Sequence, residues 1–200
     1  MSKTVRIVGV IVVLVVVVFA GWRYYEAHRA RQAGMIAESI THDGDVWTAD
    51  MTARVAAPED SVYNAIRDVQ NTHSDQVKAV RVESDSGNSK VVDMDINGPG
   101  GQPITTRLEF DYDPANHRIT YHTLDNPMLH TDAEYTLDDE GGGSTLIKVH
   151  ETTKFAQSLP VPDGVIKDVI RGIFVSQLEG LKHTLHVDTA DKTNEDDTGF

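Results

Sequence analysis

The segment Val161–His186 reads VPDGVIKDVIRGIFVSQLEGLKHTLH, and it decides how the rest of the chain can fold. Its apolar residues recur at steps of one, three and four, the spacing of an amphipathic α-helix with one broad buried face. They are Val165, Ile166, Val169, Ile170, Ile173, Phe174, Leu178, Leu181 and Leu185. Pro162 suits the first turn of such a helix, and Lys182 suits the last turn. A helix with so large an apolar face needs a sheet to pack against.

One flank of this predicted helix carries small residues. Gly172, Ser176 and Gly180 are spaced by four and therefore lie on one side of the helix. Small side chains there leave free volume between the helix and its partner. A close approach of the helix to the sheet explains them equally well.

Upstream of residue 161 the hydrophobic period changes from that of a helix to that of a strand. Trp47, Met51 and Val55 are apolar and alternate with polar residues, as in a strand with one buried face. We expect about seven such strands joined by short turns, which favours an antiparallel meander. Their ranges are 47–55, 80–83, 92–96, 104–112, 119–123, 133–137 and 147–155. Between the first and the second, Ala57–Asp60 ends the strand and opens a short helix.

These elements predict an α+β fold. Almost every strand has one apolar and one charged face, and the C-terminal helix is the only large apolar partner that the sequence provides. We therefore expect a strongly curved antiparallel sheet wrapped on the long C-terminal helix.

The order of elements resembles the START and polyketide-cyclase superfamily, also named SRPBCC, whose members have a helix-grip fold. The resemblance rests on Val55–Tyr63 (VAAPEDSVY), on Ile66–Asp68, on the meander and on the helix end Leu178–Lys182 (LEGLK). It covers roughly residues 45–187.

This resemblance implies a cavity between sheet and helix that holds a lipid or another hydrophobic small molecule. The inward-facing residues suit such a site, because ligand pockets are mostly apolar with a few polar groups. Thr106, Thr123 and tyrosine hydroxyls are candidate polar contacts. The predicted ligand-binding residues are Trp47, Met51, Val82, Met94, Leu108, Phe110, Tyr121, Tyr135, Val149, Phe155, Val169, Gly172, Ile173 and Ser176. The alternative is a solid core, which the sequence pattern alone does not distinguish from a hollow one.

The N-terminus carries a membrane signal. Ile7–Ala20 (IVGVIVVLVVVVFA) is apolar without interruption, with basic residues before it and aromatic and basic residues after it. We interpret residues 1–25 as a transmembrane helix, a single-pass anchor that holds the folded domain outside the cytoplasm. A cleavable signal peptide is the alternative, because the run is shorter than the roughly 20 residues of a usual span. Residues 26–44 then form a juxtamembrane linker, 45–187 the domain and 188–200 an acidic disordered tail.

Composition and motifs exclude several function classes. The formal net charge of −13 disfavours a nucleic-acid partner, and the lack of Cys excludes thiolate chemistry and disulfides. Asp93–Gly98 matches the first half of a calcium loop, but Ile104 stands where the bidentate Glu is required. Histidines at 122, 130 and 150 fall on the charged sheet face, and 183 and 186 fall near the helix end. We predict no metal site, no cofactor and no catalytic residues.

Two function classes remain, besides a structural envelope domain without a ligand. The first is a membrane-anchored binding or transfer module for a hydrophobic molecule. The second is a cyclase- or hydratase-type enzyme of the same superfamily, with Tyr121, Tyr135 or a His as proton donor. The enzyme requires a titratable group inside the cavity. The strand acids at 93, 95, 109, 111, 132 and 134 are all expected on the outer face.

Overall fold

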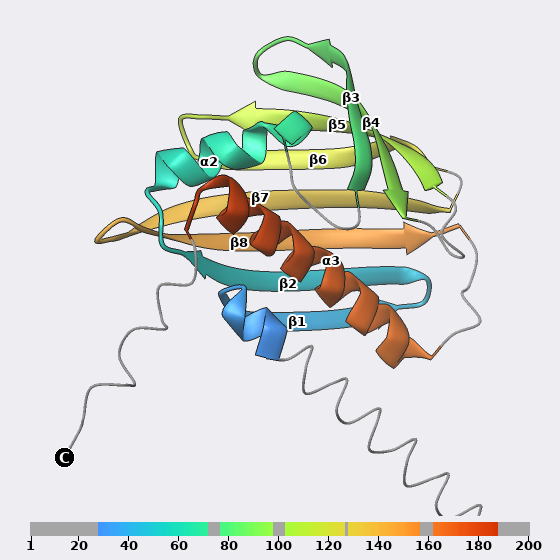
Figure 1. Cartoon of the computed structure of the whole chain (residues 1–200). Helices are drawn as coiled ribbons and strands as arrows, with labels where there is room; N and C mark the ends of the chain where they lie inside the picture. The colour runs from blue at the N-terminus through green and yellow to red at the C-terminus, as the bar shows by residue number, and fades with distance from the viewer. Residues whose placement is uncertain (1–27, 72–76, 98–102, 127, 157–161, 188–200) are drawn as a thin grey trace, which may run out of the picture.

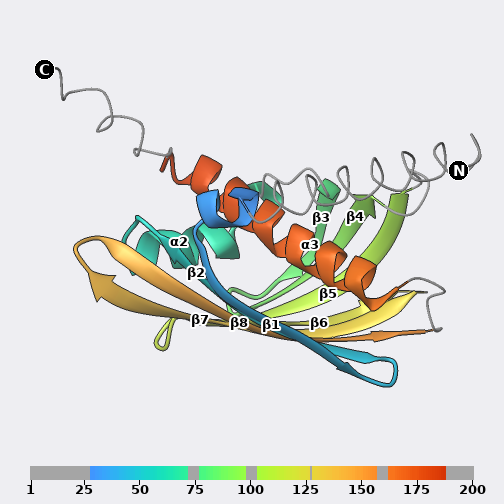
Figure 2. The same cartoon turned by 90° about the horizontal axis from the view of Figure 1, so that it is seen from below.

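The computed structural model describes residues 28–71, 77–97, 103–126, 128–156 and 162–187. In this part of the chain one antiparallel sheet curves around a long helix that crosses its concave face (Figures 1 and 2). The predicted α+β class with a curved sheet on the C-terminal helix is confirmed.

The sheet has eight strands in the order β1-β2-β8-β7-β6-β5-β4-β3, and every neighbouring pair is antiparallel. The last six strands form a meander, and β8 returns to pair with β2. The strands are β1 (Met35–Asp43), β2 (Val46–Val55), β3 (Val77–Asp85), β4 (Ser89–Asn97), β5 (Pro103–Asp113), β6 (Arg118–Asp125), β7 (Leu129–Gly141) and β8 (Ser144–Phe155).

Strand β1 corrects two expectations, the count of about seven strands and the linker at 26–44. Met35–Asp43 lies within that segment and pairs with β2 along its length. Ile40 is its only buried residue, and Ile36 is half exposed. An edge strand of this kind is held by backbone hydrogen bonds and needs no apolar alternation, so the sequence pattern gave no sign of it.

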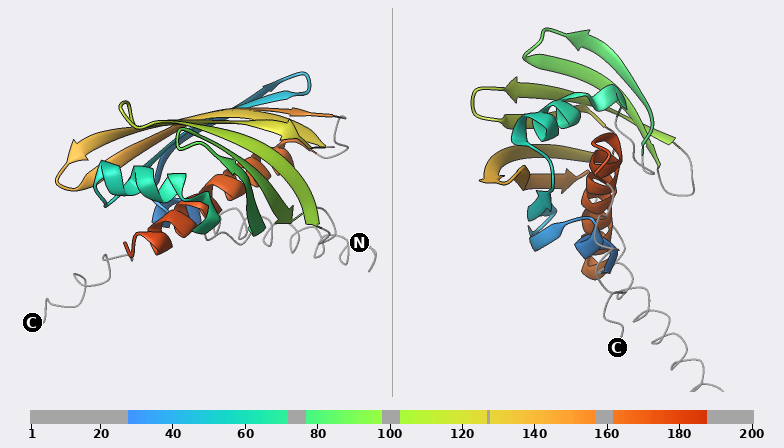
Figure 3. Two further views of the ribbon diagram at one scale, coloured as in Figure 1. Left: turned by 90° about the horizontal axis from the view of Figure 1, so that it is seen from above. Right: turned by 60° about the vertical axis from the view of Figure 1, so that its left-hand side comes forward.

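Within the described residues, helices α2 and α3 and a 3₁₀ turn lie on the concave side of the sheet (Figure 3). Helix α2 (Glu59–Arg67) follows β2 and buries Val62 and Tyr63, and the 3₁₀ turn η1 (Val69–Asn71) follows it. Helix α3 (Asp163–Thr184) starts after Pro162 and ends two residues before the predicted end. Its buried face consists of Ile166, Ile170, Phe174, Val175, Ser176, Leu178, Gly180 and Leu181.

The first described residues are hydrogen-bonded to the C-terminal half of α3. Residues 28–32 form a helical turn, in which Arg29 Nε donates a 2.8 Å hydrogen bond to Glu179 Oε1. Lys182 Nζ donates to the Gln32 carbonyl at 2.8 Å. Gly34 then turns the chain into β1 with φ +95°, and a Cβ there would lie 2.3 Å from the Arg54 carbonyl oxygen. The turn therefore requires glycine.

The predicted transmembrane helix falls at residues 1–25, outside the described part of the chain. Among the described residues, no helix is both long enough and apolar enough to cross a membrane. The acidic tail at 188–200 also lies outside the described residues.

Candidate ligand-binding cavity

A cavity of about 590 Å³ separates α3 from the curved sheet. This is within the usual range of 300–1,000 Å³ for small-molecule sites. Strands β4–β8 form one wall, α3 the opposite wall, and α2 with η1 close one side. Met128, Val165, Val169 and Ile173 line the cavity and are each more than one third exposed. They mark where it opens to solvent.

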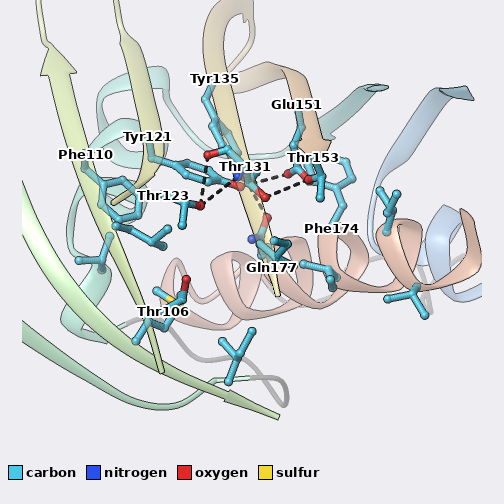
Figure 4. Close-up of a pocket in the computed structure, with 18 of the residues that line it drawn as sticks. Thr106, Phe110, Tyr121, Thr123, Thr131, Tyr135, Glu151, Thr153, Phe174 and Gln177 are labelled. Carbon is cyan, nitrogen blue, oxygen red and sulfur yellow. Dashed lines mark hydrogen bonds between the residues drawn. The ribbon is translucent and has the colours of Figure 1, made fainter. Parts of the chain in front are cut away.

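Most of the lining is aliphatic and aromatic. Phe110, Tyr121 and Tyr135 form a row of rings across β5, β6 and β7, with successive centroids 5.3 Å and 6.1 Å apart (Figure 4). Phe174 faces them from α3. The other apolar lining residues are Ala65, Ile66, Val69, Met94, Ile96, Ile104, Leu108, Ile119, Met128, Leu129, Ile147, Phe155, Val165, Ile166, Val169, Ile170, Ile173, Leu178 and Leu181.

A polar cluster interrupts this apolar surface at the inner faces of β6, β7 and β8 (Figure 4). Glu151 Oε2 accepts a 3.1 Å hydrogen bond from the Tyr121 hydroxyl, and Oε1 accepts one of 3.1 Å from Thr153 Oγ1. Thr153 Oγ1 lies 2.9 Å from Thr131 Oγ1. The Thr131 amide donates to Thr123 Oγ1 at 3.0 Å. We define Tyr121, Thr123, Thr131, Glu151 and Thr153 as the polar cluster.

Burial changes the acid–base properties of this cluster. It raises the pKa of Glu151 above its usual value, although the hydrogen bonds from Tyr121 and Thr153 act in the opposite direction. Burial also raises the pKa of Tyr121 well above normal, and the nearby Glu151 carboxyl adds to the rise. Both side chains are therefore biased toward their protonated forms.

Two further polar contacts lie on the cavity wall. The Tyr135 hydroxyl donates a 3.0 Å hydrogen bond to Gln177 Oε1, which connects β7 to α3. Burial raises the pKa of Tyr135 too. Asn126 Nδ2 donates to Thr106 Oγ1 at 2.9 Å. Thr106 and Thr123 thus line the cavity, as the sequence suggested.

The structure brings together many of the predicted site residues. Those that line the cavity are Met94, Leu108, Phe110, Tyr121, Tyr135, Phe155, Val169 and Ile173. Their contact with a ligand stays a prediction.

The other predicted site residues, Trp47, Met51, Val82, Val149, Gly172 and Ser176, lie outside the lining. Trp47 is 4% exposed and stacks on His42, and Met51 and Val149 are buried as direct partners on β2 and β8. Trp47, Met51 and Val149 belong to the buried hydrophobic core and do not line the cavity. Val82 lies on the edge strand β3 and packs only partly on the core.

Two small residues of α3 also depart from the expectation. No atom would lie within 4 Å of a Cβ on Gly172, so this residue makes no close approach to the sheet. Ser176 is buried but lies outside the cavity lining. Of the three small residues, Gly180 alone contributes to the lining.

Glu151 is the functional candidate that the sequence reading missed. It shares the strand parity of Ile147, Val149 and Thr153, so alternation along β8 places it on the inner face. The expectation that strand acids lie outside holds for Asp93, Asp95, Glu109, Asp111, Asp132 and Glu134, none of which lines the cavity. The expectation that no strand acid lies inside the cavity is wrong, because Glu151 lines it.

The outer face of the sheet carries paired charges. Asp93 and Asp95 accept hydrogen bonds of 2.7 Å from Arg107 and Arg81, respectively. These two acids, which match the start of a calcium loop, therefore lie within strand β4 and pair with arginines of the neighbouring strands. His122 and His150 lie on this face, as predicted, beside Glu109 and Asp50. Among the described residues, no three His, Asp or Glu side chains are grouped to hold a metal ion.

The site can therefore do two things chemically. It can bury an apolar molecule with a few directional hydrogen bonds, and it can exchange a proton through the Glu151–Tyr121 pair. Among the described residues that line the cavity, none is Lys, Arg or His.

A family model described as polyketide cyclase / dehydrase and lipid transport matches residues 46–186. No curated protein matches the chain.

Several solved structures share the fold. A START superfamily protein from Mycobacterium smegmatis has a TM-score of 0.60 and 18% identity, over 71% of this chain and 99% of that one. The Zhui aromatase/cyclase from Streptomyces sp. R1128 has a TM-score of 0.57 and 18% identity, over 70% and 96%. Ara h 8.0201 has a TM-score of 0.56 and 16% identity, over 72% and 99%. At these identities the likeness establishes the helix-grip architecture alone.

Proposed function

The chain belongs to the polyketide cyclase / dehydrase and lipid transport family over residues 46–186, and from this membership we propose that it binds or transfers a lipid or another hydrophobic small molecule in the sheet–helix cavity. The observation that carries the proposal is the cavity itself. A 590 Å³ space with a mainly apolar lining and an open mouth is costly to leave in a folded domain, because its walls lose packing contacts. An apolar occupant restores those contacts.

The family description supports the same chemistry. Polyketides and lipids are both hydrophobic molecules with a few polar groups, which matches an apolar lining interrupted by a polar cluster. The aromatase/cyclase and START protein with the same fold are consistent with this substrate class.

We further propose that the domain works at a membrane, held there by the apolar run Ile7–Ala20 and facing away from the cytoplasm. The segment that leads out of this run is joined to α3 through Arg29 and Glu179. A tether of this kind raises the local concentration of the cavity near its lipid source. Expression of the full chain, membrane fractionation and protease accessibility of the domain test the proposal. Recovery of the intact chain in the soluble fraction contradicts it.

The direct test of binding is extraction of the purified chain with organic solvent, followed by mass spectrometry. We expect an apolar molecule in stoichiometric amount. The variant for comparison is Val169→Lys, which places a charge at the exposed mouth of the cavity without disturbing the buried core. It should fold and yield much less of the molecule. Equal yields from both proteins, or no extracted molecule and no binding of an apolar probe, refute the proposal.

A second candidate function is a proton-transfer step of the cyclase or hydratase kind. The observation that favours it is Glu151 on the cavity wall with the Tyr121 hydroxyl 3.1 Å from its carboxylate oxygen. Because burial raises the pKa of Glu151, its carboxyl keeps a proton to higher pH than an exposed Glu and can serve as a general acid. Incubation of the wild-type chain with the molecule extracted from the Glu151→Gln variant should then yield a product that differs in mass by one water. The Glu151→Gln variant should bind the molecule and leave its mass unchanged.

A further inference from the structure

The charge content of the cavity limits what its occupant can carry inward. Among the described residues that line the cavity, Glu151 is the only acid, and Lys, Arg and His are absent. A carboxylate or phosphate buried there would lose its hydration without gaining a cationic partner. It would also meet whatever negative charge Glu151 retains.

The polar cluster provides hydrogen bonds for a neutral group. Each oxygen of Glu151 accepts one hydrogen bond from the protein, from Tyr121 and from Thr153, so each keeps capacity for a second partner. When protonated, the carboxyl also has one proton to donate. A hydroxyl can donate to the cluster and accept from it, and a carbonyl can accept the proton.

The position of the cluster sets the orientation of the occupant. Tyr121, Glu151 and Thr153 come from the inner faces of β6 and β8, whereas the exposed residues Val165, Val169 and Ile173 belong to α3 at the mouth. Most of the remaining wall is apolar, and Phe110 and Phe174 are among its residues (Figure 4). An occupant that reaches the cluster therefore enters with its polar end first.

We propose that the cavity selects an amphiphile whose buried end is an uncharged hydroxyl or carbonyl, held at Glu151, Tyr121 and Thr153, and that it discriminates against the same molecule with a carboxylate at that end. This inference rests on the proposed function, because it specifies the ligand class of the same cavity. The buried end thereby differs from that of a free fatty acid bound through its carboxylate.

The test is competition on the purified full chain, with the neutral fluorophore N-phenyl-1-naphthylamine as reporter. The competitors are 1-decanol, decanoate and decylamine at pH 8, which share one alkyl chain. We expect decanol to displace the reporter at a concentration at least tenfold lower than decanoate. Equal potency of decanol and decanoate, or tighter binding of decylamine than of decanol, overturns the inference.

Variants connect the selectivity to the cluster. Glu151→Leu should weaken decanol binding by roughly threefold to tenfold, the effect of one or two lost hydrogen bonds, and leave decanoate unchanged or tighter. Tyr121→Phe removes one hydroxyl and serves if the leucine variant does not fold. Asp132→Asn, on the outer face of the neighbouring strand β7, is the matched control and should behave as the wild type. Decanol binding that none of the cluster variants alters contradicts the assignment.

The readouts separate this inference from the proposed function. If the reporter itself does not bind, the hydrophobic-ligand function fails. If the reporter binds and decanoate competes as well as decanol, the function stands and the selectivity at Glu151 fails.

Discussion

Two isoleucines of α3 provide a matched test of where the interior is packed and where it is open. Ile170 and Ile173 both line the cavity, but Ile170 is 7% exposed and Ile173 is 44% exposed. Replacement by alanine removes the same three carbon atoms at each position and changes helix propensity equally. Any difference between the two variants therefore reports the surroundings of the side chain.

The expected magnitudes follow from burial. Three buried carbons are worth about 2.4 kcal/mol at roughly 0.8 kcal/mol each. For Ile170, which is almost fully buried, the void left behind brings the loss to about 3 kcal/mol. For Ile173, just over half of the transfer energy applies and no closed void forms, so we expect about 1.3 kcal/mol.

Thermal unfolding followed by circular dichroism measures the difference. At about 2–4 °C for each kcal/mol, the melting temperature should fall by about 6–12 °C for Ile170→Ala and by about 3–5 °C for Ile173→Ala. Binding of the fluorescent reporter supplies the second readout. Ile173→Ala should weaken reporter binding by roughly threefold to tenfold, because a bound molecule would cover the part of the Ile173 side chain that is exposed to solvent in the empty domain. Equal losses of stability, or unchanged reporter binding in Ile173→Ala, would refute the account of an open mouth at this position.

Three other perturbations test separate parts of the structure. Burial raises the pKa of Glu151, so the native state binds this proton more tightly than the unfolded chain, and the stability of the wild type falls as pH rises from the ordinary Glu pKa toward the raised one. In urea titrations, the stability of Glu151→Gln relative to wild type should therefore increase as pH rises from the ordinary Glu pKa of 4.5 toward the raised one, and a constant difference contradicts this. Gly34→Ala should cost at least about 1–3 kcal/mol, since it places a methyl group against the Arg54 carbonyl at positive φ, and an unchanged melting temperature would show that the turn can rearrange. Arg171→Ala should cost about 1–3 kcal/mol by releasing the Nε bond of 2.6 Å to Glu38 on β1, and hydrogen exchange should accelerate in β1 first.

The order of the elements could be predicted because the apolar residues of most strands and of α3 recur with a regular period. Alternation from Trp47 onward and the helical spacing up to Leu181 identified β2, the six-strand meander and α3. Strand β1 could not be predicted in the same way, since Ile40 is its single buried residue and its pairing depends on backbone groups that every residue carries.

The candidate site was predicted less completely, for two physical reasons. Alternation tells which face of the sheet a side chain lies on, but the separation of sheet and helix depends on curvature. Met51 and Tyr121 therefore share the inner face, while only Tyr121 reaches the cavity. The same alternation rule also places Glu151 on the inner face of β8. The prediction named mainly apolar residues for that face, so it did not include this acidic residue.

On the proposed function, the uneven interior has a consequence for the stability of this protein. The inner face of β2 is buried and does not line the cavity, whereas β4–β8 line it and would gain packing contacts from an occupant. A ligand that binds only the native state stabilises it by RT ln(1 + [L]/Kd), so the free energy of unfolding should rise with the concentration of the occupant. The empty domain would then unfold more often than the occupied one, and supply of the proposed occupant would affect how long each copy survives.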